Sequence, residues 1–482
     1  MMMTRCATVL LGLGALAGVD GMRARRAPLQ PSSAAGVGTT EPLFVSEYLP
    51  DRYELAQNLS RVEIEGWEHP SHAGLLTIDA PTSSNTFFWF LPALSGDADA
   101  PVLLWLQGGP GASSLFGMFS EIGPFNIGAD LEPVRNPVHW NQNYSLLFFD
   151  NPIGVGFSFT QDASRLVTNM STVGSDLRTA LLQFFTLFPE QRANDFYVTG
   201  ESYGGKYTTA CAHAILRGNA DDAASARINL RGLSIGDGAV DPAQQFSGYG
   251  ATLLAWGMIS ADERAVFDAY DARVASALAA GDAHSAFAIF DEMLNGDFFP
   301  YPTYYTNATG LTNYFNLEQG DCGASCDPAY FEAWLNTPAA RDAIHVGGAT
   351  PYASYNASVE LALKGDWMVG VLDMLVPVLE ADGVKVQMYA GTNDLILGPP
   401  PTARMLDSLD WSGAATYASA PKTVWRVEGV DEGGAIDPIA GYCRSAQNFT
   451  FAVVRGAGHM VPTDQPQRAL DLITRFVDGR GC

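Results

Sequence analysis

The chain of 482 residues is 47% hydrophobic and 11% aromatic, which is enough apolar material for a sizeable core and excludes disorder along its whole length. Its formal net charge of −25 disfavours partners that attract basic surfaces, such as nucleic acids and anionic membranes. We therefore expect a large folded protein that binds no nucleic acid and does not insert into a membrane.

The first residues are typical of a secretory signal peptide. Arg5 precedes the apolar run ATVLLGLGALAG, which is shorter than the ~20 residues that a membrane span requires. We predict a signal at 1–20 and a possible short pro-segment or linker at 21–44. No later segment is apolar enough to span a membrane.

Short apolar runs followed by turn residues recur along the chain and predict buried strands. These runs are PVLLWLQGG (101–109), YSLLFFDNP (144–152), DFYVTG (195–200), LRGLSIGDG (230–238), VKVQMYAGTND (384–394) and FTFAVVRGAGH (449–459). Helical stretches such as 173–188 and 465–479 lie between or after them. This alternation predicts an α/β fold with a mostly parallel central sheet flanked by helices, where active sites form at strand ends.

Residues 243–344 interrupt the alternation. The stretch is Ala-rich and helical in pattern, then aromatic and polar, and no strand signal occurs in it. We predict a helical cap insertion over the site, between core segments 45–242 and 345–482. The alternative is two more crossover helices and a long loop.

The nucleophile is a choice between two serines, because G-x-S-x-G occurs at Ser202 (GESYG) and at Ser234 (GLSIG). A nucleophile elbow needs a strand before the serine and a helix after it. Ser202 has both, whereas Ser234 lies inside an apolar strand that a loop follows. We therefore predict Ser202 as the nucleophile and Ser234 as a core residue.

The acid and the base should follow Ser202 in chain order. His459 stands in a glycine-rich turn after the last strand, and Asp394 in the turn after the preceding strand. The other candidates fit less well, because they lie on predicted helices, in a loop or in the insertion: His213, His284, His345, Asp366, Asp373 and Asp410. In this triad His459 accepts the proton of Ser202, and Asp394 orients the imidazolium.

Two backbone N–H groups are expected to form an oxyanion hole. The residue after the nucleophile, Tyr203, supplies one donor, and the glycine run WLQGGPG supplies the other, for which we choose Gly109. The alternative is that the run is an ordinary glycine-rich turn without a catalytic role.

Six N-x-S/T sequons, more than chance predicts, indicate a glycosylated protein of the secretory pathway. They begin at Asn58, Asn143, Asn169, Asn307, Asn356 and Asn448. After the signal five cysteines remain, an odd number, and DCGASCD could close a Cys322–Cys326 disulfide, although spacing alone does not prove it. No C-x-x-C or H-E-x-x-H pattern occurs, so we expect neither a metal nor a cofactor.

Taken together, these residues resemble the serine carboxypeptidase family, which has the α/β-hydrolase fold. The resemblance runs from about residue 45 to the C-terminus and rests on six ordered blocks, three of which are WLQGGPGASS, GESYGGKY and GAGHMVPTDQP. Gln107 and the stretches IGDGAVDP and AIHVGG lean toward the vitellogenic-like branch.

The resemblance implies a serine-type carboxypeptidase that removes the last amino acid from peptide and protein C-termini. The family holds the substrate carboxylate with residues that correspond here to Gln107, Gly108, Glu121 and Glu201. If the two glutamates face each other, one pKa is raised, and binding is best in mild acid. We therefore expect an acidic pH optimum and a lysosome-like or vacuolar lumen, or secretion.

Two residues depart from the family pattern. Gln107 replaces an asparagine and keeps the amide while adding a methylene group, and Ala112 replaces a cysteine, so one common family disulfide cannot form. Two other functions stay open: an acyltransferase that uses the same triad, and a largely non-catalytic binding or protective role. Nothing in the sequence indicates an oligomeric state.

Overall fold

The computed structural model describes residues 40–67, 69–221, 223–320, 328–348, 350–427, 430–431, 434–435 and 439–481. The predicted signal at 1–20, most of the predicted linker, and Cys322 and Cys326 lie outside these ranges. Cys443, which lies inside them, is disulfide-bonded.

Within the described ranges, ten strands form one sheet, in the spatial order β1-β2-β6-β3-β7-β8-β9-β14-β13-β10. Their bounds are β1 (His72–Asp79), β2 (Ser84–Leu91), β3 (Val102–Leu106), β6 (Ser145–Phe149), β7 (Phe196–Glu201), β8 (Leu230–Gly236), β9 (Lys385–Gly391), β10 (Thr423–Arg426), β13 (Ile439–Ala446) and β14 (Phe449–Val454).

The centre of the sheet is parallel and its edges are antiparallel. Neighbouring strands from β6 through β3, β7, β8 and β9 to β14 pair in parallel. The pairs β1–β2, β2–β6, β13–β14 and β10–β13 are antiparallel. The predicted mostly parallel sheet is therefore confirmed, and the carboxyl ends of its central strands meet along one edge.

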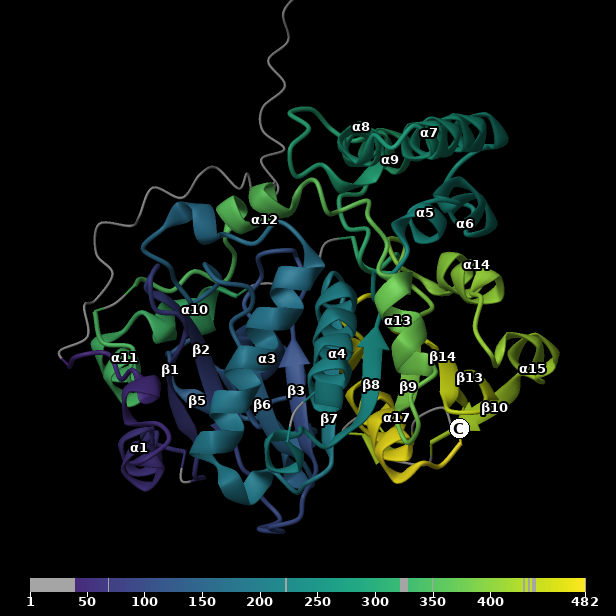
Figure 1. Cartoon of the computed structure of the whole chain (residues 1–482). Helices are drawn as coiled ribbons and strands as arrows, with labels where there is room; N and C mark the ends of the chain where they lie inside the picture. The colour runs from purple at the N-terminus through teal and green to yellow at the C-terminus, as the bar shows by residue number, and fades with distance from the viewer. Residues whose placement is uncertain are drawn as a thin grey trace, which may run out of the picture. The chain divides into compact units, whose positions relative to one another are not determined.

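Both faces of the sheet are largely buried, which explains why the central strands consist mostly of apolar residues. In β3, Val102, Leu104 and Leu106 belong to one hydrophobic core, whereas Leu103 and Trp105 belong to the other. The first core includes side chains of α3 (Met170–Leu187), α4 (Gly204–Asp221) and α13 (Leu372–Leu379), which lie in front of the sheet in Figure 1. The second core includes α2 (Leu115–Ser120), α10 (Ala329–Leu335) and α17 (Pro466–Asp478).

The connection from β8 to β9 is helical, and its described residues contain no strand. Its helices are α5 (Pro242–Gln245), α6 (Tyr249–Ala255), α7 (Ala261–Ala279), α8 (Ala283–Phe290), α9 (Tyr304–Thr309), α10, α11 (Pro338–Ala343), α12 (Ala357–Leu363) and α13. Figure 1 shows α7, α8 and α9 beyond the upper ends of the central strands. Residues 34–482 group as one compact unit, so the domain boundaries given above stay a prediction.

Besides short 3₁₀ and π segments, the described chain contains further α-helices and strands. The remaining helices are α1 (Tyr53–Leu59), α14 (Pro399–Ser408), α15 (Ala414–Ser419) and α16 (Val461–Asp464), and the remaining strands are β4 (Phe125–Ile127), β5 (Pro133–Arg135), β11 (Val430–Asp431) and β12 (Gly434–Ala435).

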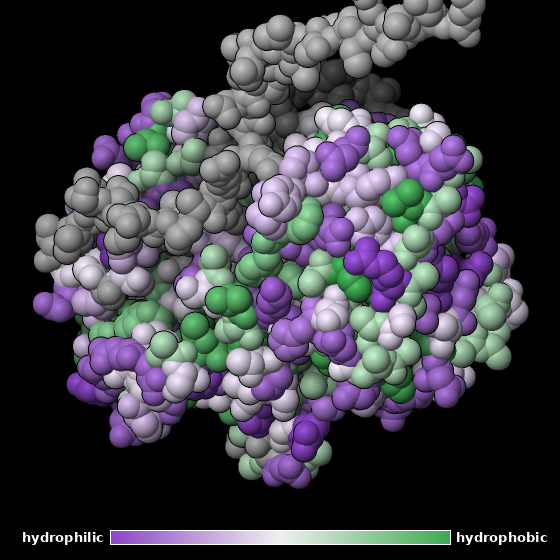
Figure 2. Space-filling view, turned by 90° about the horizontal axis from the view of Figure 1, so that it is seen from above, coloured by the Kyte–Doolittle hydropathy of each residue, from purple (hydrophilic) through white to green (hydrophobic). Residues whose placement is uncertain are grey.

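None of the helices in the described ranges is both long and apolar enough to cross a membrane. In the view from above in Figure 2, polar and apolar residues are interspersed over the part that is not grey. In the connection between β8 and β9, the large exposed apolar side chains, such as Trp256, Tyr301 and Leu361, come from separate segments.

Candidate active site

Ser202 stands on a sharp turn between strand β7 and helix α4. Its φ of 62° lies in the left-handed region that a non-glycine residue rarely adopts. Gly200 and Gly204 permit the turn, because a Cβ at either position would collide with the carbonyl oxygen of Leu106 on the adjacent strand. This strand–turn–helix geometry is that of a nucleophile elbow.

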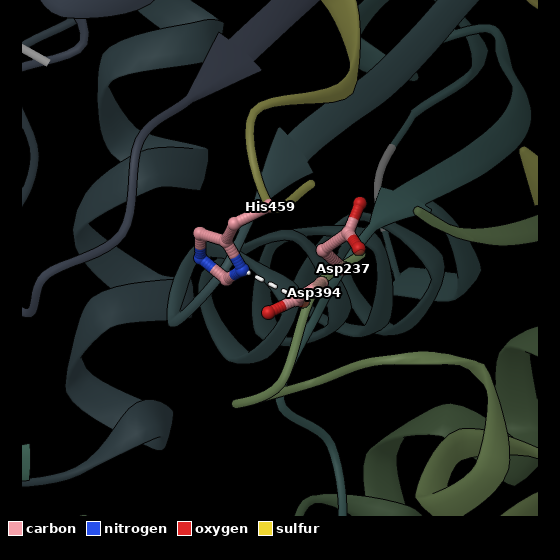
Figure 3. A group of neighbouring side chains, drawn as sticks. All are labelled: Asp237, Asp394 and His459. Carbon is pink, nitrogen blue, oxygen red and sulfur yellow. Dashed lines mark hydrogen bonds and ion pairs between the residues drawn. The ribbon is translucent and has the colours of Figure 1, made fainter. Parts of the chain in front are cut away.

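Asp394 and His459 meet at the same edge of the sheet, after β9 and β14. Nδ1 of His459 donates a hydrogen bond to Oδ2 of Asp394 over 2.9 Å, and both side chains are buried (Figure 3). Asp394 also accepts backbone N–H groups of Ile396 at 3.0 Å and Leu397 at 3.3 Å. These three hydrogen bonds fix the position of the Asp394 carboxylate against the imidazole ring.

His459 is fixed from a second side by the helical connection. Its backbone N–H donates to the carbonyl of Phe315 over 2.7 Å, and the two rings lie 5.0 Å apart. Nε2 of His459 is buried and has no hydrogen-bond partner in the described part of the chain. The nitrogen that a serine hydroxyl would use is therefore free.

The glycine loop after β3 packs against the elbow. A Cβ on Gly108 would lie 2.5 Å from the backbone nitrogen of Tyr203. Among the described residues, the N–H groups of Gly109 and Tyr203 donate to no protein acceptor. Segment 354–356 holds this loop, since Ser113 N–H donates to Ser354 over 2.9 Å and Asn356 N–H to Gly111 over 2.9 Å.

Three of the four predicted carboxylate-binding residues, Gln107, Gly108 and Glu201, are connected by packing and hydrogen bonds. Nε2 of Gln107 donates to Oε1 of Glu201 over 3.0 Å, while Oε1 of Gln107 accepts from the Trp105 indole over 2.8 Å. The extra methylene of Gln107 therefore leaves its amide within reach of Glu201. Gly108 follows Gln107 directly and contacts the elbow.

Glu121 and Glu201 form a buried acid pair beside the nucleophile. Burial raises the pKa of Glu121 to about 7. Burial, and then the charge of Glu121, raise the pKa of Glu201 well above its usual range. The pair therefore holds a proton in mild acid.

Two features of the site escaped the sequence analysis. Asp237, directly after β8, lies with Asp394 and His459, and the possible ligand atoms of the three residues fall within 4.8 Å of one another. Because Nδ1 of His459 donates its hydrogen to Asp394, this nitrogen offers no lone pair to an ion. The sequence signal for Asp237 was its position in GDGAVDP, where it is an acid directly after a buried strand.

The second feature is a buried ion pair between Lys206 and Asp366. Nζ of Lys206, on α4, contacts Oδ2 of Asp366, which also accepts the hydroxyl of Tyr203 over 2.7 Å. Asp366 lies in a turn after α12, so the expectation that it belongs to a helix was wrong. A lysine on the apolar helix behind the elbow was the signal for a buried acidic partner.

The rejected candidates lie elsewhere. Ser234 is buried inside β8, and its hydroxyl donates to Gln387 over 3.1 Å. His213 lies on α4, and His345 bonds the carbonyl of Arg61 over 2.7 Å. Asp373 is the second residue of α13, so it lies on a helix as expected.

The fold and the elbow define an α/β hydrolase with a serine nucleophile. The family model described as serine carboxypeptidase matches residues 63–479. The chain therefore belongs to the serine carboxypeptidase family and is a serine-type carboxypeptidase.

Several relatives have similar sequences over nearly their whole length. The venom serine carboxypeptidase of Apis mellifera is 41% identical, with 94% of each chain covered. The probable serine carboxypeptidase CPVL of Homo sapiens is 38% identical, covering 98% of this chain and 96% of its own. The vitellogenic carboxypeptidase of Aedes aegypti is 36% identical, covering 94% and 93%. The predicted leaning toward the vitellogenic-like branch is thereby confirmed.

A solved structure supports the fold. Kex1(Δ)p, a prohormone-processing carboxypeptidase from Saccharomyces cerevisiae, superposes with a TM-score of 0.75 at 23% identity, over 88% of this chain and 96% of its own. The predicted α/β-hydrolase fold is confirmed.

Proposed function

We propose that this carboxypeptidase releases the last amino acid of peptides through an acyl-enzyme on Ser202, with its best activity in mild acid. The observation that carries the proposal is the buried Glu121–Glu201 pair, in which Glu201 directly precedes the nucleophile and accepts a hydrogen bond from Gln107. A paired acid that holds a proton can donate it to a substrate carboxylate, which an endopeptidase site does not need.

The reaction begins when Nε2 of His459 accepts the proton of Ser202 and the serine oxygen attacks the last peptide carbonyl. The N–H groups of Gly109 and Tyr203 stabilise the resulting oxyanion. His459, held by Asp394, then gives the proton to the departing amino acid. Water, activated by the same histidine, hydrolyses the acyl-enzyme and restores Ser202.

The substrate carboxylate binds beside the nucleophile. The amide of Gln107, the backbone of Gly108 and the protonated Glu121–Glu201 pair are its proposed donors. Because Nε2 of Gln107 already donates to Glu201 over 3.0 Å, the amide and Glu201 act as one network.

A comparison of acid and amide substrates tests this function. We expect a blocked dipeptide with a free carboxylate to be cleaved roughly ten- to a hundred-fold better in kcat/KM than its amide, for each charge-assisted hydrogen bond lost. A glucose ester offered as acyl donor with an alcohol acceptor tests the acyltransferase. Equal rates on acid and amide, or transfer outpacing hydrolysis, would contradict the proposal.

We further propose that the protein works in the secretory pathway, secreted or in an acidic lumen, as the venom and vitellogenic names of its relatives imply for them. Four sequon asparagines are exposed and suit glycosylation: Asn58, Asn143, Asn169 and Asn307. Nδ2 of Asn448 donates to Leu379 at 2.9 Å and Val384 at 2.7 Å, and Nδ2 of Asn356 to Gly154 at 2.7 Å. A glycan would remove one of the two hydrogens of that nitrogen, so Asn448, which uses both, is the weaker candidate. Asn356, like Asn307, makes one such bond and would keep an N–H for it.

A further inference from the structure

Asp237 is a buried acid that the triad mechanism does not use. It directly follows β8 and is 0% exposed. Its N–H donates to Tyr389 over 2.7 Å, and its Oδ1 accepts the N–H of Gly391 over 2.8 Å. Its other oxygen, Oδ2, has no hydrogen-bond partner in the described chain.

This acid lies against the catalytic carboxylate. Atoms of Asp237, Asp394 and His459 gather within 4.8 Å (Figure 3). Among the described residues, no lysine or arginine forms an ion pair with Asp237 or Asp394. Two buried carboxylates this close, without a countercharge of their own, cannot both be ionised at low cost.

The hydrogen bonds decide which acid keeps a proton. Asp394 accepts from His459 and from two backbone N–H groups, whereas Asp237 accepts from one. Asp394 is therefore the better-stabilised anion. Burial, and then the charge of Asp394, raise the pKa of Asp237 well above its usual range.

We propose that Asp237 is a positioning residue that stays protonated during the reaction and donates its hydroxyl to Asp394. This bond would complete the set of donors around Asp394 and hold its carboxylate against the imidazole ring. The inference rests on the triad roles proposed above.

The neutral state also matters for the base. An ionised Asp237 would add a second negative charge near His459, favour the imidazolium and weaken the base in acid. The other groups facing Asp237 are Glu201, Tyr389 and Asp464. Burial raises the pKa of each of these as well.

The first test detects the proton directly. Difference infrared spectra of wild type and Asp237→Asn at pH 6 should show a neutral carboxylic acid C=O band that the variant lacks. Asp410→Asn, which changes an exposed acid, should leave that band in place. Loss of an ionised carboxylate band instead would overturn the proposal.

The second test separates hydrogen bonding from charge. Asp237→Asn keeps a neutral donor and should lose much less kcat/KM than Asp237→Ala, which should fall roughly ten- to a hundred-fold. The acid limb of the profile should coincide in wild type and Asp237→Asn. A limb displaced to lower pH, or equal losses in both variants, would overturn the proposal. The infrared result and the Asp237→Asn profile decide even if Asp237→Ala does not fold.

A fluorophosphonate probe separates this inference from the proposed mechanism. Labelling that persists after Ser202→Ala would refute the triad itself. If Ser202→Ala abolishes labelling but the infrared spectra or the Asp237 variants give one of the contradicting results above, the triad stands and only the role of Asp237 fails.

Discussion

Glu201 is an acidic residue directly before the proposed nucleophile, Ser202. It is the last residue of β7, where the strand places its side chain in the buried site, while the left-handed turn directs Ser202 elsewhere. An acid next to a nucleophile would be a liability if it were charged. Burial, and then the charge of Glu121, raise the pKa of Glu201 well above its usual range, so a protonated Glu201 can act as a donor.

The catalytic residues should behave as a unit. Ser202→Ala or His459→Ala should each lower kcat by on the order of 10⁶, and the double variant should lose little more. Steady-state kinetics on a blocked dipeptide measure this. Ser234→Ala, a buried serine in β8, is the control that should retain activity. Additive losses in the double variant would mean that the two residues do not share one step.

The acid pair should control substrate binding rather than chemistry. As pH rises through about 7, the pair loses its proton and repels the substrate carboxylate, so KM for a free-acid dipeptide should rise. Glu121→Gln, which replaces the acid that titrates near pH 7 by a neutral amide, should show little rise. Profiles of kcat and KM from pH 5 to 8 measure both. An ester without a carboxylate should keep its KM, and a parallel rise for that ester would contradict the explanation.

At the scale of elements, α4 is anchored behind the elbow by the Lys206–Asp366 pair. Lys206 is 0% exposed, so its charge is stabilised by Asp366 and by the hydroxyl of Tyr203. The backbone N–H of the same tyrosine is a proposed oxyanion donor. The pair therefore links the position of the helix to the position of Tyr203.

Removing one member of this pair should be costly. Lys206→Met should lower the free energy of unfolding by about 3–5 kcal/mol, because Asp366 would be left buried with a charge. Arg231→Met, which breaks an exposed pair with Asp195, should cost about 0–1 kcal/mol. Urea titration compares them. Adding Asp366→Asn to Lys206→Met should recover part of the loss, and no recovery would argue against an uncompensated charge.

Elements with strong local patterns could be predicted from the sequence. The six central strands, the elbow and the helical character of the β8–β9 connection all follow from apolar runs, glycines and turn residues. Partners that meet only through tertiary packing could not. Asp366 and Lys206 are 160 residues apart in sequence, and Phe315 contacts His459 from the connection between β8 and β9. Asp237 is an intermediate case. Its position directly after a strand can be predicted from the sequence, but its proximity to Asp394, which follows β9, cannot.

At the scale of the whole molecule, buried carboxyls link stability to pH. Burial raises the pKa of Glu121 from 4.5 to about 7 and that of Asp150 from 3.8 to about 7. Between these limits the native chain binds more protons than the unfolded chain, so stability falls as pH rises. Burial lowers the pKa of His72 and His139 to about 4, which acts in the opposite direction below pH 6.5.

We expect the carboxyls to prevail, because Glu201 and Asp237 add to them. Tm should be highest in mild acid, at about pH 5, and fall toward pH 8. Thermal scans in matched ionic strength measure this. Glu121→Gln should flatten the slope between pH 5 and 7. A Tm that rises steadily to pH 8 would show that the buried histidines dominate instead.

Cys211 gives this architecture a built-in reporter. The thiol is free, 0% exposed and enclosed in the core between α4 and the sheet, and burial raises its pKa well above the usual range. A thiol in that state does not react with alkylating reagents while the helix is in place. Its modification rate, followed on its own peptide by mass spectrometry, would therefore time how often the helix behind the nucleophile opens.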